Sequence, residues 1–348
     1  MYAADNDLGF TLKKNSVVSV SDIDFSVKVR SNSSGLRDND HPSWVDGSGI
    51  LVVGDSFAMG HGVKFDKTFP VLLENRLNVG IIKAGMESYS SRQAFLMMKR
   101  MIVKFPPEFV VFTFYEGNDW GDDLYVKPFH TVYGGYLVRP GTKHNIQEMY
   151  NIANKAAEDK NTTFLGTDNN ILSASKLYRY MRYKLLLSGL IINPFLHRNK
   201  DGTYDCPLPI YTPYLKADFP ENKTGKKQWE LTVNTFLDAK KLADKNGSKL
   251  IVIIIPDKIQ ACDSLRISMA DQCANLKQFG DSKIYNFSSA GMKLTAFLEQ
   301  NGIDVVNMLP YFQHDKHPEQ IYFPFDPHLS PYGHQFIANV VEAKIKTM

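Results

Sequence analysis

The sequence predicts a doubly wound α/β protein. The expected core is a parallel five-stranded sheet in a flavodoxin-like, three-layer α/β/α arrangement, with added N-terminal strands and a long insertion. Two observations support this. Five short apolar runs have the length and composition of strands buried on both faces. Segments with helical periodicity lie between them, and such alternation is typical of parallel sheets with right-handed crossovers.

The strands come first in this prediction. They are expected at Ile50–Val53, Gly80–Ala84, Phe109–Phe114, Leu250–Ile255 and Ile303–Met308. One helix is expected to begin at Thr68, an N-cap residue type followed by Pro70 in the first turn. Another begins near Ser90 or Ser91. Its predicted inner face carries Phe95, Met98 and Ile102.

Three further helices complete the predicted alternation. Two are expected over residues 226–245 and 285–300. The last begins at Ser330-Pro331, because serine is a good cap and proline suits the first helical turn. Its predicted inward residues are Phe336, Ile337, Val340 and Val341.

Two segments fall outside the alternation. Residues 1–47 form an N-terminal extension, in which residues 8–37 alternate in polarity around "DFSVKVRS" and predict antiparallel strands that pack on the core. Residues 48–348 form the main domain. Within it, residues 120–225 are a long insertion, and an insertion of this length at the edge of a sheet is typical of a lid or substrate-specificity region.

The insertion carries its own local signals. The stretch "HTVYGGYLV", residues 130–138, predicts a hairpin with a two-glycine turn. Helices are expected near residues 145–159 and 173–190. Several aromatic residues could stack on sugar rings or belong to the core: Trp120, Tyr125, Phe129, Tyr133 and Tyr136.

Composition excludes some classes of function. Of the 348 residues, 43% are hydrophobic and 22% charged, which is ordinary for a globular protein. A net charge of +3 without a compact basic run gives no indication of nucleic-acid binding. No apolar stretch is long enough to span a membrane. Residues 177–198 mix arginines, aromatics and aliphatics; we favour a helix packed on the core over a lid that touches a lipid or membrane surface.

The N-terminal sequence and the three cysteines give information about the cellular compartment. The N-terminal "MYAADNDLGF" lacks the order of a signal peptide, so the protein is cytoplasmic or the chain begins after a removed segment. The three cysteines, Cys206, Cys262 and Cys273, have no metal-binding spacing. Cys262 and Cys273 could bridge a surface loop, although three free thiols is the simpler interpretation.

The stretch "ILVVGDSFAMGHG", residues 50–62, ends a buried strand at a serine. Taken alone, Gly54-Asp55-Ser56 equally fits the capped start of a helix. A serine hydroxyl is a poor nucleophile that needs a base, and the base needs an orienting acid. Asp326 and His328 in "FPFDPHLSPYGH" offer both, because Pro327 favours an extended chain in which these two side chains point to the same side.

A third candidate follows another strand. In "FYEGNDW", Asn118 comes directly after a very apolar run, and Gly117 gives room for an approaching substrate. Acyl transfer needs donors aimed at the developing oxyanion, and an asparagine amide can supply one. The alternative is an ordinary Asx-turn. Because ligands bind at the carboxyl ends of strands in such sheets, we expect Ser56, Asn118 and His328 to meet at one edge.

These three blocks, in this order, resemble the SGNH (GDSL-type) hydrolase family across roughly residues 48–345. The resemblance implies that Ser56 is the nucleophile, His328 the base and Asp326 its orienting acid. It also implies an oxyanion hole made by the backbone N–H of Ser56, a residue of a second block, and Asn118. The family often has Asn-Leu-Gly-x-x-Gly in that second block, whereas this chain has "KAGMES", so Ser88 stands at the donor position.

Two details of the resemblance point to one branch of the family. The spacing of two residues between Asp326 and His328 resembles the branch that includes polysaccharide O-acyl-modifying proteins. The segment "RSNSSGLRD", residues 30–38, resembles one found before the first block in exported members of that branch. This likeness implies an extracytoplasmic or periplasmic location, with the cytoplasm as the alternative.

Other motifs are set aside. An α/β-hydrolase elbow needs a glycine two residues after the serine, where this chain has Ala58. The glycine-rich stretch has Phe65 in place of the third glycine of a dinucleotide fingerprint, and a P-loop sequence is absent. His314 and His317 are spaced like metal ligands, but the polar stretch around them favours a solvated loop.

The sequence leaves several functions open. The first is an esterase that removes short acyl groups such as acetyl from a carbohydrate or similar ester through an acyl-enzyme intermediate. The alternatives are an O-acyltransferase to a sugar hydroxyl, a lysophospholipase- or thioesterase-type lipid esterase, and a non-catalytic carbohydrate-binding member of a polysaccharide export system. None of the enzymatic mechanisms requires a metal or an organic cofactor.

Overall fold

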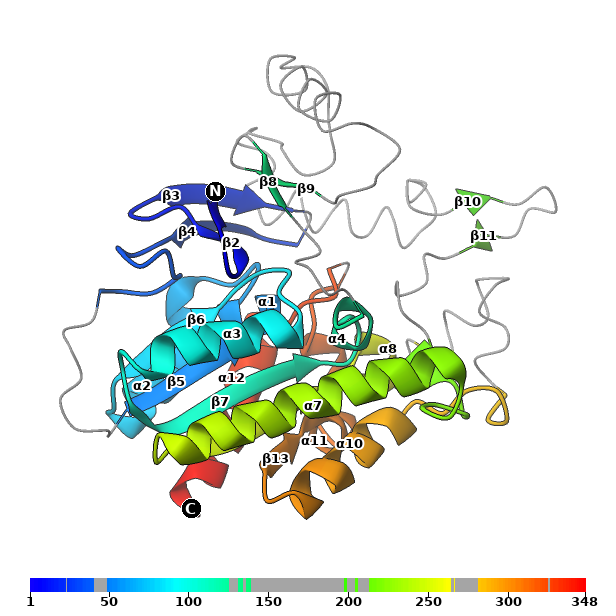
Figure 1. Ribbon diagram of the computed structural model, residues 1–348. Helices are drawn as coiled ribbons and strands as arrows, with labels where there is room; N and C mark the ends of the chain where they lie inside the picture. Colours follow the sequence, from blue (N-terminus) through cyan, green and yellow to red (C-terminus); the bar gives the residue numbers. More distant parts are fainter. Residues whose placement is uncertain are drawn as a thin grey trace.

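The computed structural model has a five-stranded parallel sheet at its centre (Figure 1). It describes residues 1–22, 24–40, 49–124, 131–133, 136–138, 197–198, 204–205, 213–263, 266, 281–324 and 326–348. The strand order is β13-β12-β7-β5-β6. Their bounds are β5 Gly49–Gly54, β6 Ile81–Gly85, β7 Pro107–Tyr115, β12 Lys249–Ile255 and β13 Asp304–Asn307. The order reverses at β5, so the predicted doubly wound, flavodoxin-like sheet is confirmed.

Helices cover both faces of the sheet. On one face lie α3 (Ser91–Ile102), α7 (Lys223–Lys245) and α10 (Ser289–Gln300); α2 (Phe69–Leu77), α11 (Met308–Gln313) and α12 (Pro331–Lys346) lie on the other (Figure 1). Successive strand residues point to opposite faces. Leu51 and Val53 therefore pack in the first layer, while Ile50 and Val52 pack in the second.

The remaining elements are short. They are α1 (Ser56–Met59), α4 (Asp119–Asp122), α8 (Lys258–Ala261), and the 3₁₀ turns η1 (Phe65–Lys67), η2 (Pro213–Leu215) and η4 (Pro318–Gln320). The paired strands outside the main sheet are β1 (Tyr2–Asp5) with β2 (Gly9–Leu12), β3 (Val17–Ser21) with β4 (Ser26–Arg30), β8 (Thr131–Tyr133) with β9 (Tyr136–Val138), and β10 (His197–Arg198) with β11 (Tyr204–Asp205).

Some predicted helix boundaries are correct and others shift. Ser90 caps α3 with a complete capping box, as its position before the apolar face suggested. Thr68 stands at the N-cap of α2, but its hydroxyl donates to the Phe65 carbonyl instead of capping the helix. The predicted last strand is one residue too long at each end. Met308 already belongs to α11, because the Asn307 side chain accepts from the Leu309 N–H and starts that helix.

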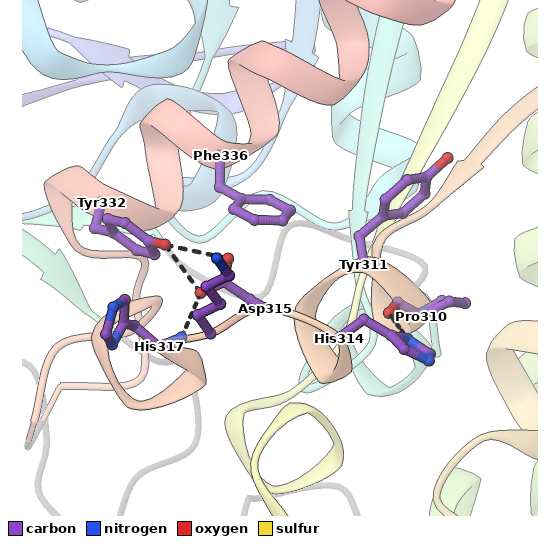
Figure 2. A pocket seen from close by; sticks show the side chains of 8 residues that line it. Pro310, Tyr311, His314, Asp315, His317, Tyr332 and Phe336 are labelled. Carbon is purple, nitrogen blue, oxygen red and sulfur yellow. Dashed lines mark hydrogen bonds between the residues drawn. The ribbon is translucent and has the colours of Figure 1, made fainter.

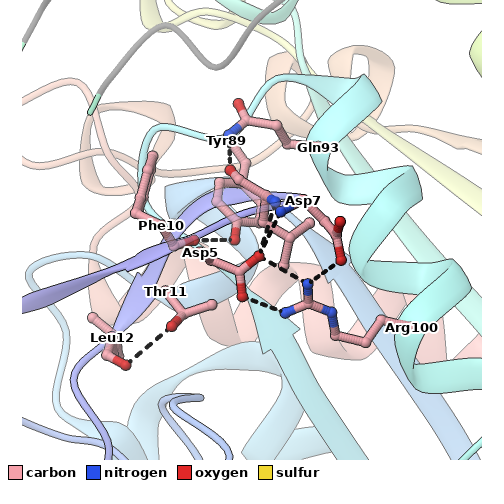
Figure 3. A network of polar contacts seen from close by, with 9 residues as sticks. Asp5, Asp7, Phe10, Thr11, Leu12, Tyr89, Gln93 and Arg100 are labelled. Atoms are coloured by element: carbon pink, nitrogen blue, oxygen red, sulfur yellow. Dashed lines mark hydrogen bonds and ion pairs between the residues drawn. The ribbon is translucent and has the colours of Figure 1, made fainter. Parts of the chain in front are cut away.

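The N-terminal strands form two antiparallel hairpins, β1–β2 and β3–β4, so the expected antiparallel pairing is observed and begins earlier than residue 8. Hairpin β1–β2 is held against α3 by polar contacts (Figure 3). The Arg100 guanidinium donates to both carboxylate oxygens of Asp5, at 2.7 and 2.8 Å. The Tyr89 hydroxyl donates to the Phe10 carbonyl at 2.6 Å, and the Gln93 amide donates to the Leu8 carbonyl at 2.7 Å.

Predictions for the insertion are only partly covered by the described residues. The predicted hairpin is confirmed, since β8 and β9 pair antiparallel. Trp120 is a core residue, packed edge-on against Phe114 and stacked on Trp229. The expected helices near 145–159 and 173–190 and the side chains of the other insertion aromatics lie outside the described residues. So do Cys206, Cys273 and nearly all of segment 177–198.

Within the described parts of the chain, no helix is both long and apolar enough to cross a membrane. Cys262 is buried at the end of α8.

Candidate active site

The carboxyl end of β5 presents Ser56 through a tight local turn. Gly54 has φ +149°, and a Cβ there would lie 1.8 Å from the Thr113 hydroxyl oxygen, so only glycine fits. Asp55 then caps α1, because its carboxylate accepts from the Phe57 N–H at 2.9 Å. This stretch can therefore both begin a helix and present a nucleophile, because Asp55 caps α1 and the Ser56 hydroxyl is not needed as a cap.

Ser56, His328 and Asp326 form a continuous hydrogen-bonded chain. The Ser56 Oγ lies 2.7 Å from His328 Nε2, and His328 Nδ1 lies 2.6 Å from Asp326 Oδ1. The His328 backbone N–H also donates to Asp326 Oδ1 at 2.8 Å. A carboxylate at Nδ1 favours the tautomer with its proton there, which leaves Nε2 to accept the serine proton. The structure thus brings together the three residues that the sequence singled out.

The charge of Asp326 is stabilised by its partner. Burial works against the charged form, but the hydrogen bond from His328 and its nearby charge outweigh burial and hold the pKa of the Asp326 carboxyl below its usual value. The carboxylate is therefore ionised throughout the neutral range. It is in place to stabilise an imidazolium on His328.

The loop that carries the acid and the base is fixed by residues far away in the sequence. The Asp326 N–H donates to the carboxylate of Asp24, in the β3–β4 hairpin, at 2.7 Å. The Lys258 ammonium donates to the carbonyls of Phe323 and Pro324 at 2.6 and 2.7 Å. An N-terminal hairpin and α8 therefore both determine where the imidazole sits.

The predicted oxyanion donors occupy the ends of β6 and β7. Ser88 has φ +61°, an uncommon conformation for a residue with a side chain. No hydrogen bond joins its N–H to another described residue, so this donor is available. The Asn118 amide donates one hydrogen to Asp122 Oδ2 at 2.8 Å. Its NH₂ group has a second hydrogen for a substrate oxygen.

The segment "RSNSSGLRD" contacts the loop that follows α1. The Asn32 side chain accepts from the Ser34 and Leu36 N–H groups and shapes the turn. Buried Arg37 then donates to the carbonyls of Met59, Gly60 and Val63, at 3.1, 2.5 and 2.5 Å. This side chain holds the loop that follows α1 and keeps α1, which begins at Ser56, in position. We call residues 30–38 the strap.

A group of buried acids lies behind the strand ends. Tyr115 stacks on Phe57 at 3.9 Å, and its hydroxyl donates to Asp257 at 2.7 Å. The neighbouring Glu116 is fully buried, and burial raises the pKa of its carboxyl to about 8. Burial likewise raises the pKa of Asp55 to about 7. At neutral pH this wall of the site therefore carries less negative charge than its composition suggests.

His314 and His317 line a separate cavity of about 590 Å³ between α11 and α12 (Figure 2). His314 Nδ1 lies 2.6 Å from the Pro310 carbonyl oxygen, and the Tyr332 hydroxyl donates to both oxygens of Asp315. In the described part of the chain, the histidine and carboxylate atoms that do converge, within 4.8 Å of one another, belong to His61, Asp326 and His328.

The sequence reasoning missed one of these three residues. His61 lies in the loop after α1, and its Nδ1 is 2.6 Å from a carboxylate oxygen of Glu87. Both residues stood in the quoted motifs, one in "GHG" and the other in "KAGMES". A carboxylate beside a predicted oxyanion donor was the available signal, but the pairing itself depends on how β5 and β6 lie side by side.

A doubly wound sheet with a Ser-His-Asp hydrogen-bonded chain at the carboxyl edge of its strands has the geometry of a serine hydrolase. Residues 214–348 match the family model described as "SGNH hydrolase-like domain, acetyltransferase AlgX". The predicted resemblance to SGNH proteins is confirmed by this match, which supports ester or acyl-transfer chemistry in general. Among curated proteins, none matches this chain.

The solved structures that match this chain over most of its length are remote in sequence. A GDSL-like lipase from Bacteroides thetaiotaomicron is 12% identical, with 88% of this chain and 92% of that chain covered and a TM-score of 0.41. The lipase/acylhydrolase from Enterococcus faecalis is 13% identical, with 86% and 96% covered and a TM-score of 0.39. A member of the lipolytic protein G-D-S-L family from Veillonella parvula is 12% identical, with 84% and 94% covered and a TM-score of 0.39.

Proposed function

We propose that this protein transfers acyl groups through a covalent intermediate on Ser56, and that its substrate is a short-chain ester, such as an acetyl ester, of a carbohydrate. The observation that supports this most directly is the hydrogen-bonded chain from Ser56 Oγ through His328 to Asp326, with 2.7 and 2.6 Å between the paired atoms. A solvated or capping serine would have no need of an oriented imidazole.

The proposed reaction begins when His328 Nε2 takes the proton of Ser56 Oγ and the oxygen attacks the ester carbonyl. The backbone N–H groups of Ser56 and Ser88 and the Asn118 amide donate to the oxyanion. His328 then returns the proton to the departing alcohol, which leaves an acyl group on Ser56. Asp326 keeps the imidazole oriented and stabilises its charged form.

Water or a second hydroxyl can then accept the acyl group. Attack by water, with His328 again as base, makes the protein an esterase. Attack by a sugar hydroxyl makes it an O-acyltransferase, and the acetyltransferase named in the family match favours this second candidate. Both candidates use the same residues, and the strap's likeness to exported proteins is the basis for proposing that either acts outside the cytoplasm.

Hydrolysis of p-nitrophenyl acetate and labelling by a fluorophosphonate test the nucleophile. We expect the wild-type protein to do both, with the label on Ser56 by mass mapping. Ser56→Ala should lose labelling and reduce turnover by on the order of 10⁵ or more, while near-UV circular dichroism stays unchanged.

The matched control is Ser330→Ala, which changes a serine that caps α12 and does not contact the triad. It should keep the label. Full turnover in Ser56→Ala, or no labelling of the folded wild-type protein, contradicts the proposal and favours a non-catalytic carbohydrate-binding role. Adding an acceptor sugar and following the products separates hydrolysis from transfer.

A further inference from the structure

A second histidine–carboxylate pair lies beside the proposed catalytic residues, and the mechanism above does not use it. His61 Nδ1 is 2.6 Å from Glu87 Oε1. The other oxygen of Glu87 accepts from the hydroxyl of Tyr2, on β1. The side chains of His61 and Glu87 are only 16% and 19% exposed, so solvent screens the pair weakly.

The rings of His61 and His328 lie against each other in a tilted arrangement. Their centroids are 4.4 Å apart and their planes differ by 36°. Phe25 closes the other side of His61, edge-on at 5.1 Å, and Phe57 lies 5.0 Å from the His328 ring. The aromatic walls leave the two imidazoles little freedom to move apart. A charge on one ring is therefore strongly felt by the other.

The pair favours a charged His61. Burial opposes the charge, but the hydrogen bond and the charge of Glu87 outweigh it and raise the pKa of His61 above its usual value. For Glu87, burial is likewise outweighed, by the hydrogen bond and charge of His61 and by the Tyr2 hydroxyl, and the pKa of Glu87 falls to about 2. His61 and Glu87 thus form an ion pair under mildly acidic conditions.

We propose that His61 is a positioning residue of this centre: Glu87 and Tyr2 hold it against the His328 ring, and the charge of the His61–Glu87 pair sets the lower end of the pH range in which His328 accepts the serine proton. The inference rests on the proposed function. Glu87 has a second effect, because its negative charge offsets part of that of His61. His328 can therefore still take up the serine proton and become an imidazolium during the reaction.

Other titratable groups lie close to the two histidines or to Asp326. Arg37 in the strap acts on His61, and buried His334 on α12 interacts with His328. Asp24 near the β3–β4 turn and Lys258 on α8 interact with Asp326. All of them are unchanged in the variants below, so a difference between variants reports on the His61–Glu87 pair.

Three variants separate the charges. His61→Gln keeps a donor for Glu87 but removes the positive charge and leaves a carboxylate without its counter-charge. The acid limb of kcat/KM for p-nitrophenyl acetate should then move to higher pH by about one unit, a tenfold loss at a pH below the limb. His61→Gln/Glu87→Gln removes both charges and should move the limb back at least halfway. His314→Gln, at an exposed histidine that lines the separate cavity between α11 and α12, should leave it in place.

A purely structural role for His61 would lower kcat at every pH and leave the limb where it is. That result, or a shift to lower pH in His61→Gln, overturns the inference.

A second measurement does not depend on turnover. Histidine ¹³Cε1 resonances, titrated in the wild type and in His61→Gln, should show the His328 signal moving its midpoint in the same direction as the kinetic limb. If the folded wild type shows neither labelling nor hydrolysis, the proposed function fails. The resonance titration still decides whether the two rings are coupled, and an unmoved His328 midpoint would refute the coupling.

Discussion

At the scale of single residues, the site depends on side chains whose partners are distant in sequence. Asp24 and Asp326 are 302 positions apart, and Tyr2 and Glu87 are 85 apart. Two positions have an unusual backbone conformation. Gly54 has no room for a side chain, because a Cβ there would meet Thr113. Ser88 has a positive φ, which is unfavourable for a residue with a side chain. Strained backbone of this kind persists only where the surrounding structure enforces it, as it does at many functional sites.

Asn118→Ala tests the donor at this scale. Removing one oxyanion donor typically lowers kcat by about 10²–10³-fold with little effect on KM, because the bond strengthens in the transition state. We expect a loss of that size with p-nitrophenyl acetate. The control is Asn339→Ala, which should retain activity. Asn339 is an exposed residue of α12 whose side chain accepts a hydrogen bond from Arg76 of α2. A change confined to KM would mean that Asn118 binds substrate without stabilising the oxyanion.

At the scale of elements, the N-terminal hairpins belong to the site although they stand outside the main sheet. Hairpin β1–β2 brings Tyr2 to Glu87, and hairpin β3–β4 brings Asp24 to the loop that carries Asp326. The first hairpin in turn depends on the bidentate contact between Arg100 of α3 and Asp5 (Figure 3). Local order in the hairpins is therefore coupled to the geometry of the imidazoles.

Asp5→Asn should loosen hairpin β1–β2. The hydrogen bond from Arg100 outweighs burial and, with the Leu8 and Asp7 N–H groups, lowers the pKa of Asp5 to about 2. The contact is therefore complete above pH 4, and its contribution is lost as pH falls through about 2. At pH 6 we expect faster amide hydrogen exchange over residues 1–12 and a loss of about 1 kcal/mol of stability.

The control for this prediction is Asp7→Asn. Asp7 is a more exposed partner of the same guanidinium, at 3.1 Å, and its loss should matter much less. Equal exchange in wild type and Asp5→Asn would show that apolar packing alone holds the hairpin.

At the scale of the whole molecule, buried titratable groups determine how stability depends on pH. Burial raises the pKa of Glu116 from 4.5 to about 8, so the folded state keeps a proton that the unfolded chain has lost. The contribution of Glu116 to stability should therefore fall as pH rises from about 5 to 8 and level off above that. Burial lowers the pKa of His334 to about 3, so stability should also fall as pH drops below 6.5. The two groups together predict a maximum at mildly acidic pH.

Glu116→Gln tests the alkaline side of this profile. It removes the titrating group while keeping an oxygen that can accept from Gln260. In urea unfolding between pH 6.5 and 8, where His334 no longer contributes to the pH dependence, the variant should lose a decline of about 1 kcal/mol per pH unit that the wild type shows. Glu108→Gln, at an exposed position on the same strand, should leave the decline intact. Parallel profiles for wild type and Glu116→Gln would contradict the buried, protonated state.

Much of the fold could be predicted because its signals are local. The apolar runs predicted all five sheet strands to within two residues at each end, and Ser90 correctly predicted the start of α3. Local patterns were less reliable where one residue type fits two roles. Met308 continued an apolar run yet begins a helix, and Thr68 looked like a cap yet bonds elsewhere. Trp120 could equally have faced a sugar, and its place in the core followed only from packing against Phe114 and Trp229.

By itself the sequence determined the fold class and singled out Ser56, Asn118, Asp326 and His328 as candidates, because strand periodicity and motif order are properties of short segments. The tertiary structure alone decided which groups face those residues. The ion pair of His61 with Glu87, the hold of the strap on the loop after α1, and the support of Asp326 by Asp24 all join segments that the chain keeps far apart. Hydrogen bonds and charges act over a few ångströms in space, and only the folded chain brings these groups that close.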